Sequence, residues 1–382
     1  MDAASPASPT LPVVVQKYGG SSVADVDRIR SVARRVVDTV KAGHRVVVVV
    51  SAMGNTTNEL LALARSVTPS PRRRELDLLV SVGERVSMTL LAMAIHDLGV
   101  PARSFTGSQS GIITDNNHVA ARVEEVRPHR LFEALDSGHV VIVAGFQGVS
   151  RGGEVTTLGR GGSDTTAVVL AAALNAQWCE LCSDVDGVFT ADPRVVPDAR
   201  RLDTLPLDAA VALSRGGAKV LHAQAVELAR SLGVQLHAAS TTRRAGSGTR
   251  LPPGPAPGDP VGVTPDTRLV LTEVDALAEL PKAVAGAIVH LRSTDSGRLR
   301  VWVDTRNLPE AGVVPGARPI ATVTAVGRSL VVDPRRTALA LDASLCVPVD
   351  SWWASGESLV FSVDRSHAQA LTQALHAALL PA

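Results

Sequence analysis

Lys17 stands in a stretch whose residue types suit phosphate binding. In QKYGGSS (16–22) a β-branched run ends in lysine and two glycines, and an amphipathic helical pattern follows. Glycine lets a backbone approach a ligand closely, and the N-terminus of a helix offers free N–H groups at the positive end of its dipole. We therefore predict a phosphate-binding turn made of Lys17, Gly19, Gly20 and Ser22, with a tight turn that binds nothing as the plainer alternative. Neither G-x-x-x-x-G-K-[ST] nor G-x-G-x-x-G occurs in the sequence.

The segment TLGRGGSDTTAV (157–168) repeats this arrangement at the start of an alanine-rich helical pattern. Gly161, Gly162 and Ser163 form the turn, and Asp164 falls in the first turn of the helix. Such an apolar helix must be buried on most sides, so its N-terminus points from a dry interior toward the turn. Arg160 stands at the mouth and has the planar fork that reads a carboxylate or phosphate. Helix capping by Asp164 and a surface ion pair for Arg160 are the structural alternatives.

Two further segments carry polar residues, one at the end of an apolar strand and one after a pair of glycines. In ELCSDVDGVFTADPR (180–194) they form a polar lip: Ser183, Asp184, Asp192 and Arg194. Lys219 follows two glycines in SRGGAKVLH (214–222). Of 38 basic residues only four are lysines, and a lysine that persists beside glycines under this bias suggests a role for its compact ammonium.

Glu84 interrupts the otherwise apolar helical pattern LLVSVGERVSMTLLAMAI (78–95), where Arg85 follows it. A carboxylate buried in such a helix needs a cationic partner. That partner is either a structural arginine or the ammonium group of a ligand, and the sequence leaves both possibilities open.

The elements that must position these residues alternate between β-rich runs and amphipathic helical patterns. The predicted strands are 13–16, 45–50, 102–105, 140–144, 179–183 and 234–238. The predicted helices between them are 23–42, 75–98, 118–135 and 163–175. This alternation predicts an α/β domain with a mostly parallel sheet covered on both faces, and ligands of such sheets bind beyond the carboxyl ends of the strands.

The amino-acid composition changes near residue 250. PPGPAPGDPVG (252–262) holds five prolines and three glycines, so we predict a linker over 251–264. Beyond it, two α+β units follow in tandem over 265–382. The first has strands 268–274, 288–292 and 298–304 with a helix at 279–287. The second has strands 319–326, 346–349 and 358–364 with helices 335–342 and 367–380.

Composition excludes several classes of protein. The formal net charge is +1, and no block of like charge exceeds the three arginines at 72–74, which argues against nucleic-acid or membrane-surface partners. No apolar run reaches the roughly 18 residues of a membrane span. The start, MDAASPASPTL (1–11), predicts a disordered arm and not a signal peptide, so we expect a cytoplasmic location. Three cysteines give no disulfide framework, and because Cys179 and Cys182 have no second ligand pair nearby for zinc, we predict no metal-ligating residues.

In this order and at these intervals, the segments closely resemble the aspartokinases of the amino-acid kinase family. The matching stretches are KYGGSSVAD, VVSAMGNTTNEL, SVGERVS, GFQG, TLGRGGSDTTAV, SDVDGVFTADPR and GAKVLHAQAVELA. The resemblance is strong over roughly residues 12–250 and weak beyond them. It implies a three-layer amino-acid-kinase catalytic domain over 12–250, followed by a smaller, degenerate ACT-like domain of βαββαβ type.

The resemblance also implies roles for single residues. Lys17 and the Gly19-Gly20 amides would stabilise the transferring phosphoryl group, and Asp164 would organise the positive charges and magnesium around it. Glu84 would hold a substrate ammonium and Arg160 a substrate carboxylate. Three further residues would line the substrate side: Ser51, Thr57 and Phe146. Five would line the nucleotide side together with Asp192: Ser183, Asp184, Phe189, Arg194 and Lys219.

The implied reaction is phosphoryl transfer from ATP, as its Mg²⁺ complex, to the side-chain carboxylate of L-aspartate. A kinase of another amino-acid carboxylate in a specialised pathway and a non-catalytic regulatory homologue remain alternatives. The resemblance implies a homodimer formed through the C-terminal domain. ACT modules of this family usually bind lysine or threonine at a small-residue turn. Because neither LVLTEVDALAELPKAV (269–284) nor TAVGRSLVVDPRRTALAL (324–341) keeps that turn, we expect weak or no inhibition by either amino acid.

Overall fold

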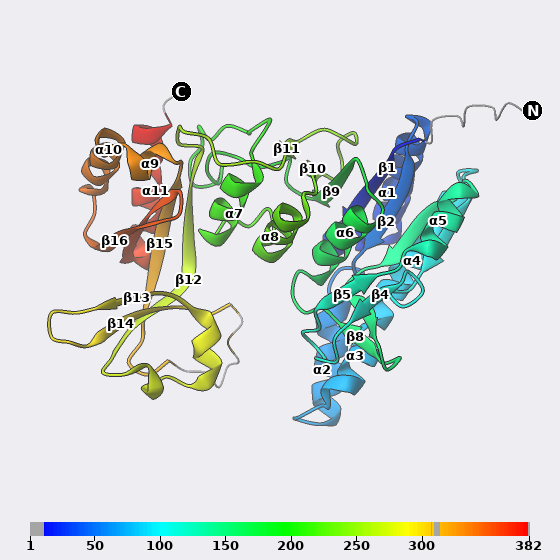
Figure 1. Ribbon diagram of the computed structural model, residues 1–382, viewed down its shortest axis with the longest axis horizontal. Helices are drawn as coiled ribbons and strands as arrows, with labels where there is room; N and C mark the ends of the chain where they lie inside the picture. Colours follow the sequence, from blue (N-terminus) through cyan, green and yellow to red (C-terminus); the bar gives the residue numbers. More distant parts are fainter. Residues whose placement is uncertain (1–10, 307, 309–313, 381–382) are drawn as a thin grey trace, which may run out of the picture. The chain divides into compact units, whose positions relative to one another are not determined.

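The computed structural model describes residues 11–306, 308 and 314–380 and divides into two compact units (Figure 1). The first unit contains the chain up to Val188 together with Leu202–Leu207 and Val220–Pro253. The second contains Phe189–Arg201, Asp208–Lys219 and the chain from Gly254 onward. Of the predicted disordered arm, residues 1–10 lie outside the described residues. The predicted boundary near 250 coincides with the last of these crossings, but the chain changes unit four times before it.

A seven-stranded sheet forms the centre of the first unit, in the order β11-β10-β9-β1-β2-β6-β3. All neighbouring strands are parallel except β10 and β11. The strands are β1 (Val13–Tyr18), β2 (Arg45–Val50), β3 (Ala102–Phe105), β6 (Val140–Ala144), β9 (Trp178–Ser183), β10 (Leu236–Ser240) and β11 (Thr249–Leu251). Their runs of valine are buried on both faces, as a parallel sheet covered by helices requires. The predicted α/β fold class is therefore confirmed.

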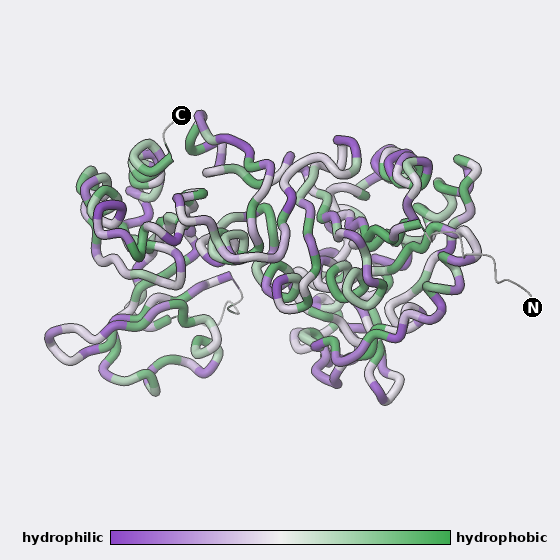
Figure 2. The backbone as a smooth tube through the Cα atoms, turned by 45° about the horizontal axis from the view of Figure 1, so that its top comes forward, coloured by the Kyte–Doolittle hydropathy of each residue, from purple (hydrophilic) through white to green (hydrophobic). Residues whose placement is uncertain are grey.

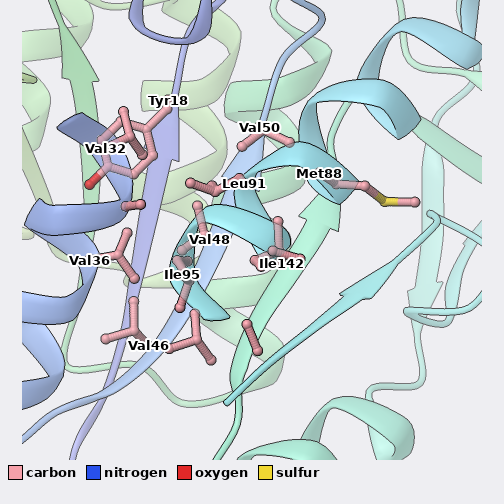
Figure 3. Packing of buried hydrophobic residues seen from close by; sticks show 14 of the residues in the cluster. Tyr18, Val32, Val36, Val46, Val48, Val50, Met88, Leu91, Ile95 and Ile142 are labelled. Atoms are coloured by element: carbon pink, nitrogen blue, oxygen red, sulfur yellow. The ribbon is translucent and has the colours of Figure 1, made fainter. Parts of the chain in front are cut away.

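Helices cover both faces of this sheet. On one face, α1 (Val26–Lys41) and α4 (Val82–His96) pack on alternate strand residues, among them Val46, Val48 and Ile142 (Figure 3). On the other face, α6 (Gly162–Ala173) packs on β1, β2 and β9, and α8 (Ala223–Leu232) packs on α6. In Figure 2 hydrophobic stretches run through the interior of each unit, and hydrophilic residues colour the outer loops and helix surfaces.

A second sheet of the first unit corrects one prediction. Its order is β5-β4-β7-β8, with β4 (Ile112–Thr114), β5 (Val123–Val126), β7 (Gln147–Ser150) and β8 (Val155–Thr157). The predicted helix 118–135 is wrong, because its first half contains β5 and only α5 (His129–Asp136) is helical. Pro128 is the reason, since it sits at the N-cap of α5 and separates the two elements.

Two further helices differ from the prediction. The predicted helix 75–98 is divided into α3 (Arg73–Val80) and α4 at Ser81, and α2 (Thr56–Val67) was not predicted. By length and composition alone, the stretch Arg73–His96 could cross a membrane. However, half of its most apolar window is buried within the protein, and α4 packs against α1 over the sheet. This is the burial expected of a core helix.

The second unit is built on one six-stranded antiparallel sheet, in the order β13-β14-β12-β15-β17-β16. The strands are β12 (Gly262–Val274), β13 (Ile288–Ser293), β14 (Leu299–Asp304), β15 (Arg318–Val326), β16 (Val349–Ser355) and β17 (Ser358–Asp364). The helices are α7 (Leu207–Arg215), α9 (Ser329–Val332), α10 (Pro334–Ser344) and α11 (Ala368–Leu379). Because β12 pairs with both β14 and β15, the two predicted α+β units share a single sheet.

Two elements of this unit were predicted wrongly. Instead of a helix over 279–287, the chain forms two 3-10 turns, η2 (Leu277–Glu279) and η3 (Lys282–Ala287), because Pro281 cannot continue a helix. Instead of a strand at 346–349, the strand β16 begins at Val349. The predicted linker overlaps the start of β12, and residues 252–261 between β11 and β12 form no helix or strand.

Candidate active site

Lys17 and Asp164 form the centre of the candidate site in the first unit. Lys17 Nζ lies 2.7 Å from Asp164 Oδ1, and the two side chains are only 15% and 16% exposed. Successive side chains of a strand point to opposite faces, so Lys17 faces α6 while Gln16 and Tyr18 face α1. The prediction placed these two residues at separate glycine turns, and the structure brings them together as an ion pair.

The turn after β1 holds Lys17 beside closely packed backbone. A Cβ added to Gly20 would lie 2.9 Å from the Ala52 carbonyl oxygen, so only glycine fits there. A Cβ added to Gly19 would lie 3.4 Å from Lys17 Nζ. The helix predicted over 23–42 begins three residues later than predicted. Residues Gly20–Val23 form a 3-10 turn, and α1 begins at Val26 with the Asp25 side chain accepting from Arg28 N.

The turn before α6 also needs its glycines. Gly161 is the N-cap of α6 and has a φ of +73°, in the left-handed region that favours glycine. A Cβ added to Gly162 would lie 2.8 Å from Phe146 Cδ2. Ser163 is buried, and Arg160 is exposed at the mouth of the turn. Phe146 itself has a φ of +68°, a conformation that costs energy in a bulky residue, and its N–H donates to Thr166 Oγ1 at 3.1 Å.

Glu84 lies in the first turn of α4 and is 2% exposed. Its Oε1 accepts from Ala52 N at 3.2 Å, and its Oε2 has no hydrogen-bond partner within the described part of the chain. Burial raises the pKa of this carboxyl to about 7. Among the described residues no arginine or lysine pairs with it. The structure therefore does not provide the structural arginine that was one of the two possible partners.

Ser51 and Thr57 flank the turn against which Glu84 packs. Ser51 follows β2, where its N–H donates to the Tyr18 carbonyl oxygen at 3.0 Å. Thr57 is the second residue of α2, and both side chains are half-buried. A Cβ added to Gly83 would lie 2.7 Å from Ala52 Cβ, which shows how closely α4 approaches this turn.

Two serines predicted on the phosphate and nucleotide sides are joined through a residue that was not predicted. Ser22 Oγ and Thr241 Oγ1 are 2.6 Å apart, and Thr241 Oγ1 also lies 3.0 Å from the Ser183 carbonyl oxygen. Ser183 Oγ accepts from Val185 N at 3.1 Å, and Asp184 is exposed. Thr241 thus connects the turn after β1 to the end of β9.

The other residues predicted on the nucleotide side belong to the second unit. Asp192 accepts from Arg194 Nε at 3.0 Å and from Arg194 Nη2 at 2.7 Å. These hydrogen bonds from Arg194 lower the pKa of Asp192. Phe189 is half-buried and Lys219 is exposed. Their segments are anchored within this unit, because Thr190 Oγ1 lies 2.9 Å from His376 Nε2 of α11 and Val263 N donates to the Thr190 carbonyl oxygen.

One network near the site gave no signal in the sequence. The buried Asp77 of α3 accepts from Thr157 Oγ1 at 2.5 Å and from Val119 N at 3.1 Å, and it lies 2.6 Å from His118 Nδ1. Val119, a β-branched residue, has a φ of +75°. Asp77 thereby fixes the loop before β5 and the end of β8, and β8 leads to Arg160. Within the described ranges no three His, Cys, Asp or Glu side chains are placed to hold a metal ion.

In mostly parallel α/β sheets ligands bind beyond the carboxyl ends of the strands, and helix N-termini attract anions. Lys17, near the end of β1, and Asp164, in the first turn of α6, lie at such a position. The chain belongs to the amino acid kinase family, whose match covers residues 12–240. It is 59% identical to the aspartokinase of Mycolicibacterium smegmatis over 232 residues, which is 60% of this chain and 55% of that protein. The chain thus spans about half the length of the curated relatives it matches.

Two solved structures extend this likeness. The aspartate kinase of Synechocystis is 33% identical, with a TM-score of 0.59 over 96% of this chain and 69% of that one. E. coli aspartokinase III, in complex with aspartate and ADP, has a TM-score of 0.82 over 96% of this chain and 99% of that one. At 24% identity the second likeness concerns the fold alone, and it includes the smaller antiparallel domain.

Proposed function

We propose that this chain is an aspartate kinase, which transfers the γ-phosphoryl group of ATP to the side-chain carboxylate of L-aspartate and releases 4-phospho-L-aspartate and ADP. The curated relatives, which match over about 232 residues of this chain, are named aspartokinase, and the E. coli structure contains aspartate and ADP. The observation that carries the proposal is Glu84, a buried carboxylate without a cationic partner among the described residues, in the unit that holds the Lys17–Asp164 pair.

The acceptor is held by opposite charges. A buried carboxylate such as Glu84 needs a cationic partner. The ammonium group of an amino acid can be that partner, so no structural arginine is needed. Arg160, exposed at the turn before α6, has the planar fork that receives a carboxylate with two hydrogen bonds. Ser51, Thr57 and Phe146 complete the substrate side. A ligand with an ammonium and a carboxylate group fits this pair of charges.

The phosphoryl group is stabilised by Lys17 and by the N–H groups of Gly19 and Gly20. Phosphoryl transfer is catalysed mainly by positioning and by charge, so a compact ammonium beside closely packed glycine backbone serves it directly. Asp164 holds the Lys17 ammonium in place at 2.7 Å. Gly161, Gly162 and Ser163 add the N-terminus of α6, a helix of twelve residues, to the same site.

We include Mg²⁺ with ATP in this proposal. A nucleotide-bound Mg²⁺ typically takes one or two protein carboxylates and fills its other positions with phosphate oxygens and water. Asp164, partly exposed beside Lys17, fits that requirement, which needs no cluster of three protein ligands. When bound, the ion neutralises charge on the phosphates. On the nucleotide side of the first unit we place Ser22, Ser183 and Asp184.

An ADP-release assay with L-aspartate tests the reaction, with hydroxylamine to trap the acyl phosphate. Glutamate, N-acetylglutamate and aspartate analogues serve as competing acceptors. We expect ADP and hydroxamate in equal amounts, with aspartate the best acceptor. Faster turnover with another acceptor would identify a different amino-acid kinase, and nucleotide binding without turnover would identify a non-catalytic homologue. Either result contradicts the proposal.

We further propose that lysine and threonine inhibit the enzyme weakly or not at all, and that the second unit forms a homodimer interface. In the first stretch where an effector turn is expected (269–284), the chain forms the 3-10 turns η2 and η3. In the second stretch (324–341), the Asp333 side chain caps α10 by accepting from Arg335 N. An inhibitor must distinguish two states of the protein, which requires a formed pocket. Steady-state assays and calorimetry with both amino acids decide this, and cooperative inhibition below millimolar concentration would contradict it.

A further inference from the structure

A cavity of about 710 Å³ lies in the first unit, between α1, the start of β9 and the loop after β10. Its volume is within the range of small-molecule sites. It lies on the other face of the sheet from the Lys17–Asp164 pair. The reason is strand alternation, since Gln16 and Tyr18 point toward Thr39 and Arg35 of α1, whereas Lys17 points toward α6. The cavity is therefore distinct from the Lys17–Asp164 pair, although its lining residue Thr241 contacts Ser22 and the Ser183 carbonyl oxygen of the predicted nucleotide side.

Positive charge dominates the lining of this cavity. Four arginines contribute to it, two from α1 and two from the loop after β10: Arg34, Arg35, Arg243 and Arg244. Asp38 is the acidic residue in the lining. Arg243 lies 3.7 Å from Asp186, and Arg34 Nη2 lies 3.5 Å from Ser31 Oγ. Arg34, Arg243 and Arg244 are exposed, so they can meet an incoming ligand.

Arg35 forms the buried end of the cavity, with its side chain 6% exposed. Its Nη1 donates to Glu180 Oε2 at 3.0 Å and to the Tyr18 hydroxyl at 2.9 Å, and its Nε donates to the Arg243 carbonyl oxygen at 2.8 Å. These bonds fix the plane of the guanidinium. Its Nη2 has no acceptor among the described residues. A buried donor without an acceptor costs free energy, which a bound acceptor would recover.

Two more nitrogen atoms in the same lining lack a partner within the described residues. They are Trp178 Nε1 and His44 Nδ1, and both are buried. The Trp178 indole contacts the His44 ring edge-on at a centroid distance of 5.0 Å and stacks on His237 at 5.2 Å. The lining thus combines a flat aromatic wall with unmatched nitrogen atoms and a cluster of arginines.

We propose that this cavity, here called the α1 cavity, binds a small polyanion with carboxylate or phosphate groups. The exposed arginines make the first contacts. Because Arg35 Nη2 is buried, side chains of the lining shift when the ligand binds. Arg35 then donates to one oxyanion group through Nη2, and Trp178 lines the remainder of the ligand. Arginine suits both oxyanions, since its fork matches each of them. This site goes beyond the proposed kinase reaction and does not depend on it.

Fluorine NMR of the full chain labelled with 5-fluorotryptophan tests this proposal. The chain has four tryptophans, of which Trp178 alone lies in the first unit and the others are at 302, 352 and 353. The Trp178→Phe variant assigns its resonance. Pyrophosphate and citrate serve as the phosphate and carboxylate probes. We expect at least one of them to shift the Trp178 resonance saturably, and the anion that binds more tightly identifies the preferred oxyanion.

The variant Arg34→Ala/Arg244→Ala supplies the decisive comparison, because both side chains are exposed and their loss should leave the fold intact. We expect it to weaken binding by roughly tenfold or more. Arg65→Ala, an exposed arginine of α2 outside the cavity, should bind as the wild type does. The proposal is overturned if neither anion shifts Trp178 up to about 10 mM, a weak-binding limit. It is equally overturned if the double variant binds the anion as tightly as the wild type does. In that case the anion binds at another site, for example near Lys17, and shifts the Trp178 resonance from there.

Discussion

At the scale of single residues, the charge on Lys17 is the feature on which the proposed chemistry depends most. Lys17→Ala should lower kcat by on the order of a hundredfold or more, because the developing charge on the phosphoryl group loses its nearest cation. Lys17→Arg should restore little, since a planar guanidinium does not replace a point charge packed at Gly19. Steady-state kinetics and thermal melting of each variant provide the measurement.

Lys41→Ala is the matched control for this change, because Lys41 is exposed at the end of α1. It should keep wild-type kcat. Near-normal turnover in a folded Lys17→Ala variant would show that Lys17 has no part in the transfer.

Glu84 should give the protein a distinct dependence on pH. Burial raises its pKa from an ordinary 4.5 to about 7, so the folded chain keeps a proton that the unfolded chain has lost. Stability therefore falls as pH rises from about 4.5 through about 7. Glu84→Gln removes this cost, and at pH 8 it should be more stable than the wild type by on the order of 2–3 kcal/mol. At pH 4 the difference should be small, which urea unfolding at the two pH values can measure.

The same residue should also control acceptor binding. Below about pH 7 the free enzyme protonates Glu84, so the KM for aspartate should rise as pH falls while the KM for ATP changes little. Glu84→Gln should have a high aspartate KM at every pH. The exposed Glu59→Gln of α2 is the control and should alter neither stability nor KM. If Glu84→Gln weakens ATP instead, the residue belongs to the nucleotide side.

At the scale of elements, Asp77 holds together three segments that meet beside Arg160. Asp77→Asn removes a buried charge that accepts from Thr157 and Val119, so it should cost about 3 kcal/mol of stability. It should also raise the KM for aspartate, because β8 carries the turn that presents Arg160. The exposed Asp97→Asn after α4 should change neither quantity. An unchanged KM in a destabilised Asp77→Asn would limit this network to a structural role.

Elements with strong local signals could be predicted from the sequence. The predicted strands 45–50 and 140–144 coincide with β2 and β6, because runs of β-branched residues bounded by turn residues are unambiguous. The predicted strands 102–105 and 358–364 also coincide with β3 and β17. Short strands of mixed polarity, such as β5, read instead as parts of helices. The division between α3 and α4 at Ser81 and the 3-10 turns around Pro281 each depend on a few residues. Hydrophobic periodicity over a longer window does not reveal them.

In the candidate site, too, some residues could be predicted from local sequence and others could not. The predictions for Lys17, Arg160 and Asp164 came from glycine turns with adjacent charges, which are visible in the local sequence. The contacts of Thr241 with Ser22 and of Asp77 with Thr157 join residues 219 and 80 positions apart. No local pattern predicts such pairs, because they depend on how strands and loops come together in the fold.

At the scale of the whole molecule, each unit is assembled from separate stretches of chain. Phe189–Arg201 and Asp208–Lys219 lie before the boundary predicted at 250, yet they belong to the second unit. A chain truncated to residues 12–250 should therefore lose the partners of Thr190 and Leu213, which lie on α11 and at Gly262. We expect it to aggregate or to bind a hydrophobic dye, whereas residues 12–382 should behave as the full chain. A soluble, cooperatively melting 12–250 would contradict this.

The same interleaving has a consequence for synthesis on the ribosome. Thr190 emerges nearly two hundred residues before His376, with which it pairs at 2.9 Å. During that interval the segments 189–201 and 208–219 have no strand β12 and no helix α11 to pack on. The nascent chain therefore cannot complete one unit and then begin the next, as tandem domains do. Its second unit closes only after His376 has been synthesised, so the exposed early segments are where a chaperone would be needed.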